Sequence, residues 1–181
     1  MKQLILICAV VMGQSVVDAD EKPLTKKESA KVIEEVIRDN LGKPTGELTK
    51  ADLEKVKELF LVNKQLTHVK GLEKLTQLTD LHLLDNQLTD VKGLENLTQL
   101  TFLSLGGNKL TSVKGLEKLT QLEELYLDDN KLTDVKGVEK LTKLKALWLS
   151  FNQQTEVPKG LEKLTKLEGL NLAANQLTDV K

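Results

Sequence analysis

The stretch LTDLHLLDNQLTDVKGLENLTQ, which runs from Leu78 to Gln99, decides the fold because the chain repeats it. The next stretch, LTFLSLGGNKLTSVKGLEKLTQ, begins at Leu100, and LEELYLDDNKLTDVKGVEKLTK begins at Leu122. Apolar residues therefore return every 22 positions. Such a fixed period indicates a solenoid, in which each unit completes the core of its neighbours and does not fold alone.

The repeats extend in both directions from this stretch. The first unit begins at Val56 and carries Lys64 where the later units carry Asn. The fifth unit begins at Leu144, is one residue longer, and has Gln154 in place of a leucine. A sixth, incomplete unit begins at Leu167. We expect the first unit to be a capping repeat, and we expect Gln154 to weaken the core locally.

Each unit contains a leucine alternation that predicts a short β-strand. Because strand side chains alternate between faces, Leu81 and Leu83 are predicted to point inward and His82 outward. The strands of successive units are then expected to stack in parallel at about 4.8 Å per step. A valine is expected to turn the chain inward again, and a glycine to allow a tight turn into the outer side. The valines are Val69, Val91, Val113, Val135 and Val157, and the glycines are Gly71, Gly93, Gly115, Gly137 and Gly160.

An asparagine stands where the chain leaves each strand from the second unit on. An amide has two donor hydrogens and an acceptor oxygen, so it is expected to satisfy backbone groups in the bend and to link to the next asparagine. We therefore interpret these residues as a structural ladder and not as a binding site. The ladder consists of Asn86, Asn108, Asn130, Asn152 and Asn175.

The units share the pattern L-x-x-L-x-L-x-x-N-x-L, seen for example from Leu78 to Leu88. In this pattern the chain resembles the leucine-rich repeat family, and specifically the 22-residue class found in bacterial internalins and in phosphatase-regulatory repeat proteins. The resemblance covers residues 56–181. It implies an α/β repeat solenoid that is a curved right-handed coil, with a parallel β-sheet on its concave face and an N-terminal capping helix.

The N-terminal residues divide into two further regions. Residues 1–19 have a lysine, a short apolar run and small residues before Asp20, which predicts a secretory signal peptide cleaved before Asp20. The single cysteine, Cys8, lies in this run, so the mature chain is predicted to have no disulfide. Residues 20–55 predict a helical cap: Thr25 and Glu28 fit a capping box, and Gly42 fits a helix end. Residues 56–181 form the repeat domain.

The helix predicted after Thr25 carries an apolar stripe at helical spacing. We interpret this stripe as the surface that packs on the first repeat. Its polar face is mixed in sign, which disfavours a role at a membrane. The stripe consists of Val32, Ile33, Val36, Ile37 and Leu41.

A comparison of the repeats with one another locates the candidate binding surface. Outward strand positions vary while the rest of each unit is copied, and all five aromatic residues fall on outward or strand-end positions. Exposed aromatic side chains on a rigid sheet favour binding to a protein. Gly106 and Gly107 predict an open floor between His82 and Tyr126. The predicted partner-binding residues are Phe60, His82, Leu84, Phe102, Tyr126, Asp128, Trp148 and Phe151.

Other function classes find little support in the sequence. The formal net charge of −1 disfavours nucleic acid as a partner. His68 and His82 occupy different positions of the 22-residue repeat, and no cysteine or serine is evidently paired with either. We therefore predict neither an enzyme nor a cofactor. Adjacent Asp128 and Asp129 are expected to point apart and to form an acidic patch that tunes partner choice instead of a calcium site.

The sequence favours an exported bacterial protein, secreted, periplasmic or at the cell surface, that binds a protein partner without chemistry. Two alternatives stay open. In the first, the chain is an N-terminal fragment or a structural subunit of a larger surface assembly and self-associates through its last repeat. In the second, it is a cytosolic protein of the phosphatase-regulatory type. The first alternative is motivated by Leu172, Leu177 and Val180, which would present the edge of an uncapped repeat.

Overall fold

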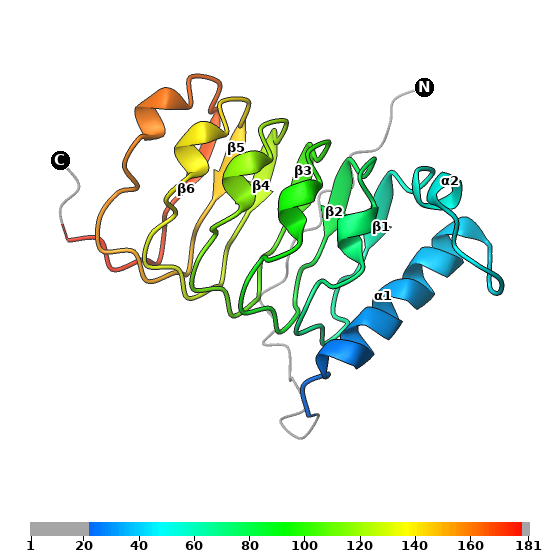
Figure 1. The fold of residues 1–181 in the computed structure, drawn as a ribbon. Coiled ribbons are helices and arrows are strands. Elements are labelled where there is room, and N and C mark those ends of the chain that lie inside the picture. Colours follow the sequence, from blue (N-terminus) through cyan, green and yellow to red (C-terminus); the bar gives the residue numbers. More distant parts are fainter. Residues whose placement is uncertain (1–21, 179–181) are drawn as a thin grey trace, which may run out of the picture.

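Helix α1 (Lys26–Leu41) covers one end of the solenoid in the computed structural model, which describes residues 22–178 (Figure 1). The Thr25 hydroxyl accepts a hydrogen bond from the Glu28 backbone N–H, and the Glu28 carboxylate accepts one from the Thr25 N–H. Gly42 ends the helix with a φ of 59°. Ile33 and Ile37 are buried. The predicted capping box, helix end and apolar stripe are thus confirmed.

A second, short helix, α2 (Lys50–Leu53), leads into the first strand. Thr49 and Asp52 form another capping box. The Lys43 ammonium also donates to the Asp52 carboxylate, over 2.6 Å. Hydrogen bonds from Lys43 and Thr49 hold the pKa of Asp52 far below its ordinary value.

Six strands form one parallel sheet in chain order. Each strand is shifted by one repeat from its neighbour, so that Leu59 pairs with Leu81 and Leu81 with Leu103. The central leucines of the first five strands are fully buried. The strands are β1 (Glu58–Phe60), β2 (Asp80–His82), β3 (Phe102–Ser104), β4 (Glu124–Tyr126), β5 (Ala146–Trp148) and β6 (Gly169–Asn171).

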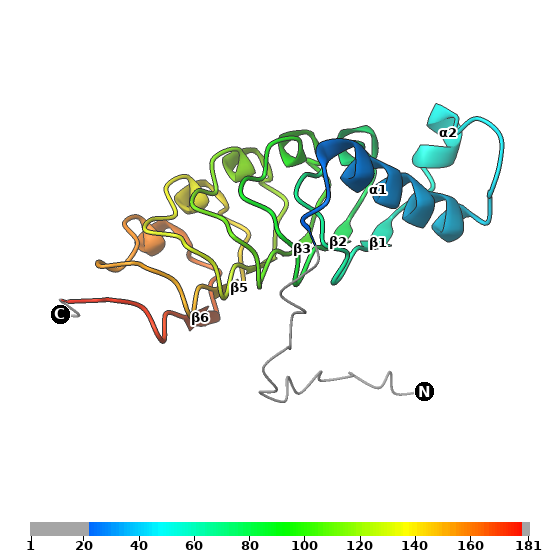
Figure 2. The ribbon, with the colours of Figure 1, turned by 90° about the horizontal axis from the view of Figure 1, so that it is seen from below.

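Single turns of 3-10 helix form the opposite wall of the solenoid (Figure 2). Each begins after a glycine whose φ lies between 87° and 112°, a region in which a side chain would be strained. In the first four turns, a glutamate carboxylate accepts the N–H of that glycine, as Glu73 does for Gly71. The turns are η1 (Leu72–Lys74), η2 (Leu94–Asn96), η3 (Leu116–Lys118), η4 (Val138–Lys140) and η5 (Leu161–Lys163).

The fifth repeat departs from the predicted pattern. Val157 was predicted to point inward with Val69, Val91, Val113 and Val135, and this prediction is wrong: the first four of these valines are 2–4% exposed, whereas Val157 is 36% exposed. The physical reason is the extra residue at Pro158, which lengthens the return path between the valine and the glycine.

Within residues 22–178, none of the helices has the length and apolar character that crossing a bilayer requires. The predicted signal peptide and Cys8 lie outside the described residues.

Candidate protein-binding site

Five rings form a continuous row across the concave face, which we call the aromatic row: Phe60, His82, Phe102, Tyr126 and Trp148. The ring centroids are 4.4 Å apart for the first pair, then 4.7 Å, 5.3 Å and 6.2 Å. These distances fall in the range of stacked and tilted aromatic contacts. The structure thus brings together five of the eight predicted binding residues in one unbroken strip from β1 to β5.

Residues at the same position in successive strands form a column across the sheet. Phe102 belongs to a different column from the other four residues of the aromatic row. Its register partners are Asp80 and Glu124, whereas His82 and Tyr126 lie in the column that contains Ser104. Ser104 is buried, being only 9% exposed. Because serine is small, the Phe102 ring contacts both His82 and Tyr126 where the column would otherwise be interrupted.

The predicted open floor at Gly106 and Gly107 is wrong. Gly106 is buried, and a methyl group added to it would lie 3.0 Å from Leu84 Cδ1. A methyl group added to Gly107 would lie 2.2 Å from a carboxylate oxygen of Asp85. The two glycines are therefore covered by side chains of the preceding repeat, and predicted binding residue Leu84 is one of these covering groups.

His82 is partly enclosed by its neighbours in the row. Burial lowers the pKa of His82, and the nearby carboxylates of Glu58 and Asp80 oppose that effect. Glu58 Oε1 lies 3.7 Å from His82 Nε2. Burial is the larger influence, which favours the neutral imidazole.

Tyr126 and Trp148 complete the row at its C-terminal end. The Tyr126 hydroxyl donates a hydrogen bond to the Glu124 carboxylate over 2.7 Å. Burial and this hydrogen bond raise the pKa of Tyr126 to about 12, so the hydroxyl remains protonated at physiological pH. Trp148 is 36% exposed and Phe60, at the other end, is 53% exposed. Both ends of the row therefore expose apolar area on the surface.

The remaining predicted binding residues lie beside the row at the strand ends. Asp128 accepts hydrogen bonds from the Ser150 N–H, over 3.0 Å, and from the Ser150 hydroxyl. Phe151 has a φ of 53° and is 56% exposed. Phe151 does not join the stacked rings, but it adds an exposed aromatic side chain next to them.

Carboxylates border the aromatic row on both sides. Asp80 and Glu124 share the column of Phe102, and Glu58 heads it. At the opposite border, burial and the charge of Asp129 raise the pKa of Asp85. The sequence predicted an acidic patch only at Asp128 and Asp129 and did not reveal that Glu58 lies beside His82. The 22-residue period could have predicted this neighbour, because Glu58 stands 22 positions before Asp80 and therefore occupies the same position on the adjacent strand.

The asparagines are bonded to backbone groups. Asn108 Nδ2 lies within 3.0 Å of the carbonyl oxygens of Leu83, Leu105 and Gly106, and its Oδ1 accepts the Leu88 N–H. The same pattern recurs at Asn86, Asn130 and Asn152. Each amide thus connects its own repeat to the preceding one through the backbone, and not through the next asparagine as expected.

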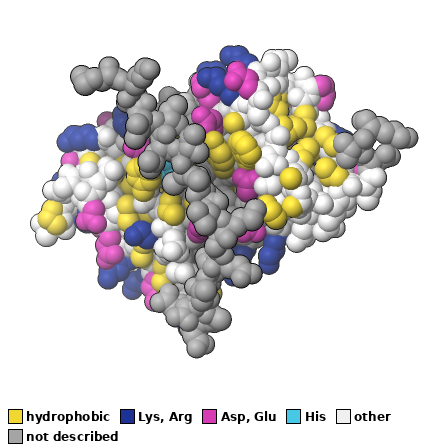
Figure 3. Space-filling view, turned by 180° about the vertical axis from the view of Figure 1, so that it is seen from behind, with side chains coloured by type: hydrophobic (Ala, Val, Ile, Leu, Met, Phe, Trp, Pro, Cys, Tyr) yellow, Lys and Arg dark blue, Asp and Glu magenta, His cyan; other side chains and the backbone are white. Residues whose placement is uncertain are grey.

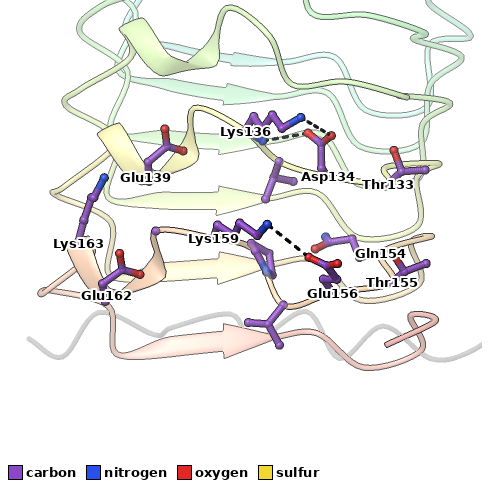
Figure 4. Close-up of a pocket in the computed structure, with 14 residues that line it drawn as sticks. Thr133, Asp134, Lys136, Glu139, Gln154, Thr155, Glu156, Lys159, Glu162 and Lys163 are labelled. Carbon is purple, nitrogen blue, oxygen red and sulfur yellow. Dashed lines mark hydrogen bonds and ion pairs between the residues drawn. The ribbon is translucent and has the colours of Figure 1, made fainter. Parts of the chain in front are cut away.

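Gln154 occupies the core position of a leucine without finding partners. The residue is 1% exposed, and within residues 22–178 neither its amide nitrogen nor its amide oxygen has a hydrogen-bond partner. It borders a cavity of about 540 Å³ between the fourth and fifth repeats (Figure 4). The rim of that cavity carries ion pairs of Lys136 with Asp134 and of Lys159 with Glu156.

The second histidine belongs to the contact between α1 and the first repeat. His68 Nδ1 lies 2.9 Å from the Thr67 hydroxyl. That hydroxyl donates to the Leu24 carbonyl over 2.6 Å, so its proton is not directed at the imidazole. Ser29 contacts Thr67 as well. Thr67 therefore ties the helical cap to the repeats and is not an activated nucleophile. In residues 22–178, three or more His, Cys, Asp or Glu side chains do not come together in a geometry that would hold a metal.

Comparisons with known proteins agree with this architecture. The family model for leucine-rich repeats (two copies) matches residues 98–138 and 120–159 of the chain. An internalin of Listeria monocytogenes, InlF, is 33% identical with a TM-score of 0.76, covering 81% of this chain and 44% of its own. A leucine-rich repeat protein of Leptospira interrogans is 36% identical with a TM-score of 0.68, covering 74% of this chain and 36% of its own. No curated protein gives a significant match.

Internalin C2 of Listeria monocytogenes is 31% identical with a TM-score of 0.63, and the match covers 82% of this chain and 76% of that protein. The chain belongs to the internalin-like leucine-rich repeat proteins, a family of protein-interaction modules. It spans less than half of the length of the first two relatives.

Proposed function

We propose that this chain is a non-enzymatic, exported bacterial module that recognises a protein partner through the concave face of its sheet. The observation that carries the proposal is the aromatic row. Five rings lie side by side on a rigid scaffold, and those at both ends are exposed. Aromatic side chains supply large contact area at small entropic cost, which is why they serve as anchors in protein interfaces.

The proposal includes the division of the chain. Residues 1–19 are a signal peptide removed before Asp20, residues 20–55 form the N-terminal cap, and residues 56–181 form the repeat domain that binds. The five asparagines of the ladder have a structural role. The partner-binding residues are those of the aromatic row together with Leu84, Asp128 and Phe151.

Capture of partners tests the binding claim. The immobilised wild-type chain is compared with a Tyr126→Ala/Trp148→Ala variant, using quantitative mass spectrometry of proteins from the surface of host or neighbouring cells. Lys92→Ala/Lys114→Ala, on the opposite wall, is the matched control, and circular dichroism verifies folding. We expect at least one partner to be lost from the aromatic variant alone. Retention of every captured protein by that variant would contradict the proposal.

The N-terminus of the protein recovered from its source tests export. Intact-mass analysis is expected to find a chain that begins at Asp20 outside the cytoplasm. A full-length chain confined to the cytosol would instead favour a protein of the phosphatase-regulatory type.

A second candidate function is that of an N-terminal portion or structural subunit of a larger surface assembly. Its motive is Leu170 on β6, which is 42% exposed, whereas its counterparts Leu125 and Leu147 are fully buried. A further repeat or a second copy would cover this leucine. Light scattering of the chain decides between these states: dimers that dissociate in a Leu170→Lys variant support self-association, and a monomer at all concentrations excludes it.

A further inference from the structure

The charges of the chain are segregated between its two walls. The four columns of the concave face begin at Glu58, Phe60, Val62 and Asn63 and continue through β6 in steps of one repeat. They contain six carboxylates and no Lys or Arg. The six are Glu58, Asp80, Asp85, Glu124, Asp128 and Asp129.

The opposite wall carries the compensating charge. Its repeated turn, as in Lys70-Gly-Leu-Glu-Lys74, has two lysines for one glutamate in four of the five repeats. The near-zero net charge of the whole chain therefore conceals an acidic concave face. Figure 3 shows hydrophobic and acidic side chains next to one another on the strand side of the molecule.

None of the six concave carboxylates forms an ion pair with Lys or Arg within residues 22–178, although the hydrogen bond and charge of Glu123, together with the charge of Glu124, raise the pKa of Lys145. Glu58 Oε1 lies 3.7 Å from His82 Nε2, and the imidazole is held toward its neutral form. Glu124 accepts from the Tyr126 hydroxyl and Asp128 from Ser150, which are neutral groups. Several carboxylates elsewhere in residues 22–178 do form ion pairs with lysine or arginine, as Glu123 does with Lys145.

The acids and the rings form a single surface. Asp80 and Glu124 lie in the same column as Phe102, on one side of the row, and Asp85 and Asp129 lie along the other. The face of an aromatic ring attracts a cation electrostatically, and a carboxylate next to it adds a charged partner. A Lys or Arg side chain placed over the row would meet both, while its aliphatic stem covers apolar ring area.

We propose that the concave face binds an extended segment of a protein partner that carries lysine or arginine side chains between apolar ones. This inference rests on the proposed function and specifies the chemistry of its partner. The row crosses five strands, or about 19 Å at the usual strand spacing, which an extended chain of about six residues covers. An acidic or neutral segment would leave the carboxylates desolvated without partners, which costs binding free energy.

Selection from a random peptide library displayed on phage tests the proposal. The peptides have about 12 residues, about twice the number needed to span the row. The full chain is the bait, and the Tyr126→Ala/Trp148→Ala variant identifies the peptides that depend on the row. We expect these peptides to be enriched in Lys and Arg over the starting library. Enrichment of row-dependent peptides without Lys or Arg would overturn the inference but support the proposed function.

Affinity measurements on the selected peptides add a second arm. Fluorescence anisotropy compares the wild-type chain with a Glu58→Gln/Asp80→Asn/Asp129→Asn variant, in which three carboxylates become neutral without loss of the rings. The expected loss is about tenfold, which corresponds to about 1.4 kcal/mol for the three charges together. The loss is expected to shrink when NaCl is raised from about 50 mM to about 300 mM.

A matched control removes three carboxylates from other surfaces. Glu35→Gln/Glu54→Gln/Glu156→Gln changes the net charge of the chain by the same amount but leaves the concave face intact. Equal losses in the two variants would show that only net charge matters and would overturn the inference. Absence of any row-dependent peptide would also overturn it, and the capture experiment then decides the proposed function separately.

Discussion

The rings of Phe102 and Tyr126 lie 5.3 Å apart although the two residues belong to different columns of the sheet. Phe102 contacts His82 on its other side. The Phe102 ring fills the space beside the small side chain of Ser104 and so keeps the aromatic row continuous. Phe102 is only partly exposed.

Replacement of Phe102 should therefore weaken the fold as well as the row. Phe102→Ala loses two ring contacts and part of a buried apolar surface, so we expect the free energy of unfolding to fall by about 1–3 kcal/mol. Urea denaturation measures the change. Phe151→Ala is the control, because Phe151 is 56% exposed and makes no stacked contact; an equal loss in both variants would contradict the assigned role of Phe102.

Gln154→Leu should stabilise the protein. The buried side-chain amide of Gln154 has no hydrogen-bond partner among the described residues, and leucines fill the same position in the four preceding repeats. Removing two unsatisfied polar atoms and restoring apolar contact should raise the free energy of unfolding by about 1–3 kcal/mol. The midpoint of urea unfolding reports the gain. Gln153→Leu, at the exposed neighbouring position, should leave the midpoint nearly unchanged; a lower midpoint for Gln154→Leu would show that the amide has partners in solution.

Asn108→Ala should be strongly destabilising. The substitution leaves the Leu88 N–H and the carbonyl groups of Leu83 and Leu105 without their amide partner inside the core. We expect a loss of about 2–4 kcal/mol, measured by thermal and urea unfolding. Asn96→Ala, on the exposed η2 turn, provides the comparison and should change stability by only a few tenths of a kcal/mol. If the two variants unfolded alike, the structural role of the ladder would be refuted.

Acidification should destabilise the wild-type chain through His82. Burial lowers the pKa of His82 in the folded protein below its ordinary value, so the unfolded chain takes up a proton at higher pH than the folded chain does. The stability associated with this residue is therefore complete above about pH 6.5 and is lost as the pH falls below it. Urea midpoints at about pH 7.5 and about pH 5 are compared for the wild type and His82→Gln. The decrease should be smaller in the variant; an identical decrease would assign the effect to other groups.

The repeat architecture could be predicted from the sequence because its determinants are local and are copied. The capping box at Thr25, the strand leucines and the glycines that precede each 3-10 turn depend on residues a few positions away. Their chemistry allows few alternatives, so the fold was predicted correctly from one sequence.

The arrangement of the concave face could be predicted only in part. The sequence assigns each side chain to a column, but the direction in which a long side chain leans depends on neighbours 22 positions away. Phe102 fills the space beside Ser104, and Leu84 and Asp85 cover Gly106 and Gly107. The exposure of Val157 has a similar origin, because the effect of one inserted residue depends on the packing of the following turn.

The unsatisfied amide of Gln154 also divides the solenoid into parts of unequal cohesion. In a repeat protein, each interface between neighbouring units contributes its own term to stability, and at the interface around Gln154 a buried side-chain amide without hydrogen-bond partners in residues 22–178 replaces a core leucine. Local opening should therefore begin there. Tyr126 and Trp148 lie on opposite sides of this weak junction, so a partner that binds both rings would hold the fourth and fifth repeats together. Its binding would slow backbone amide exchange in the fifth repeat, well away from the surface that it covers.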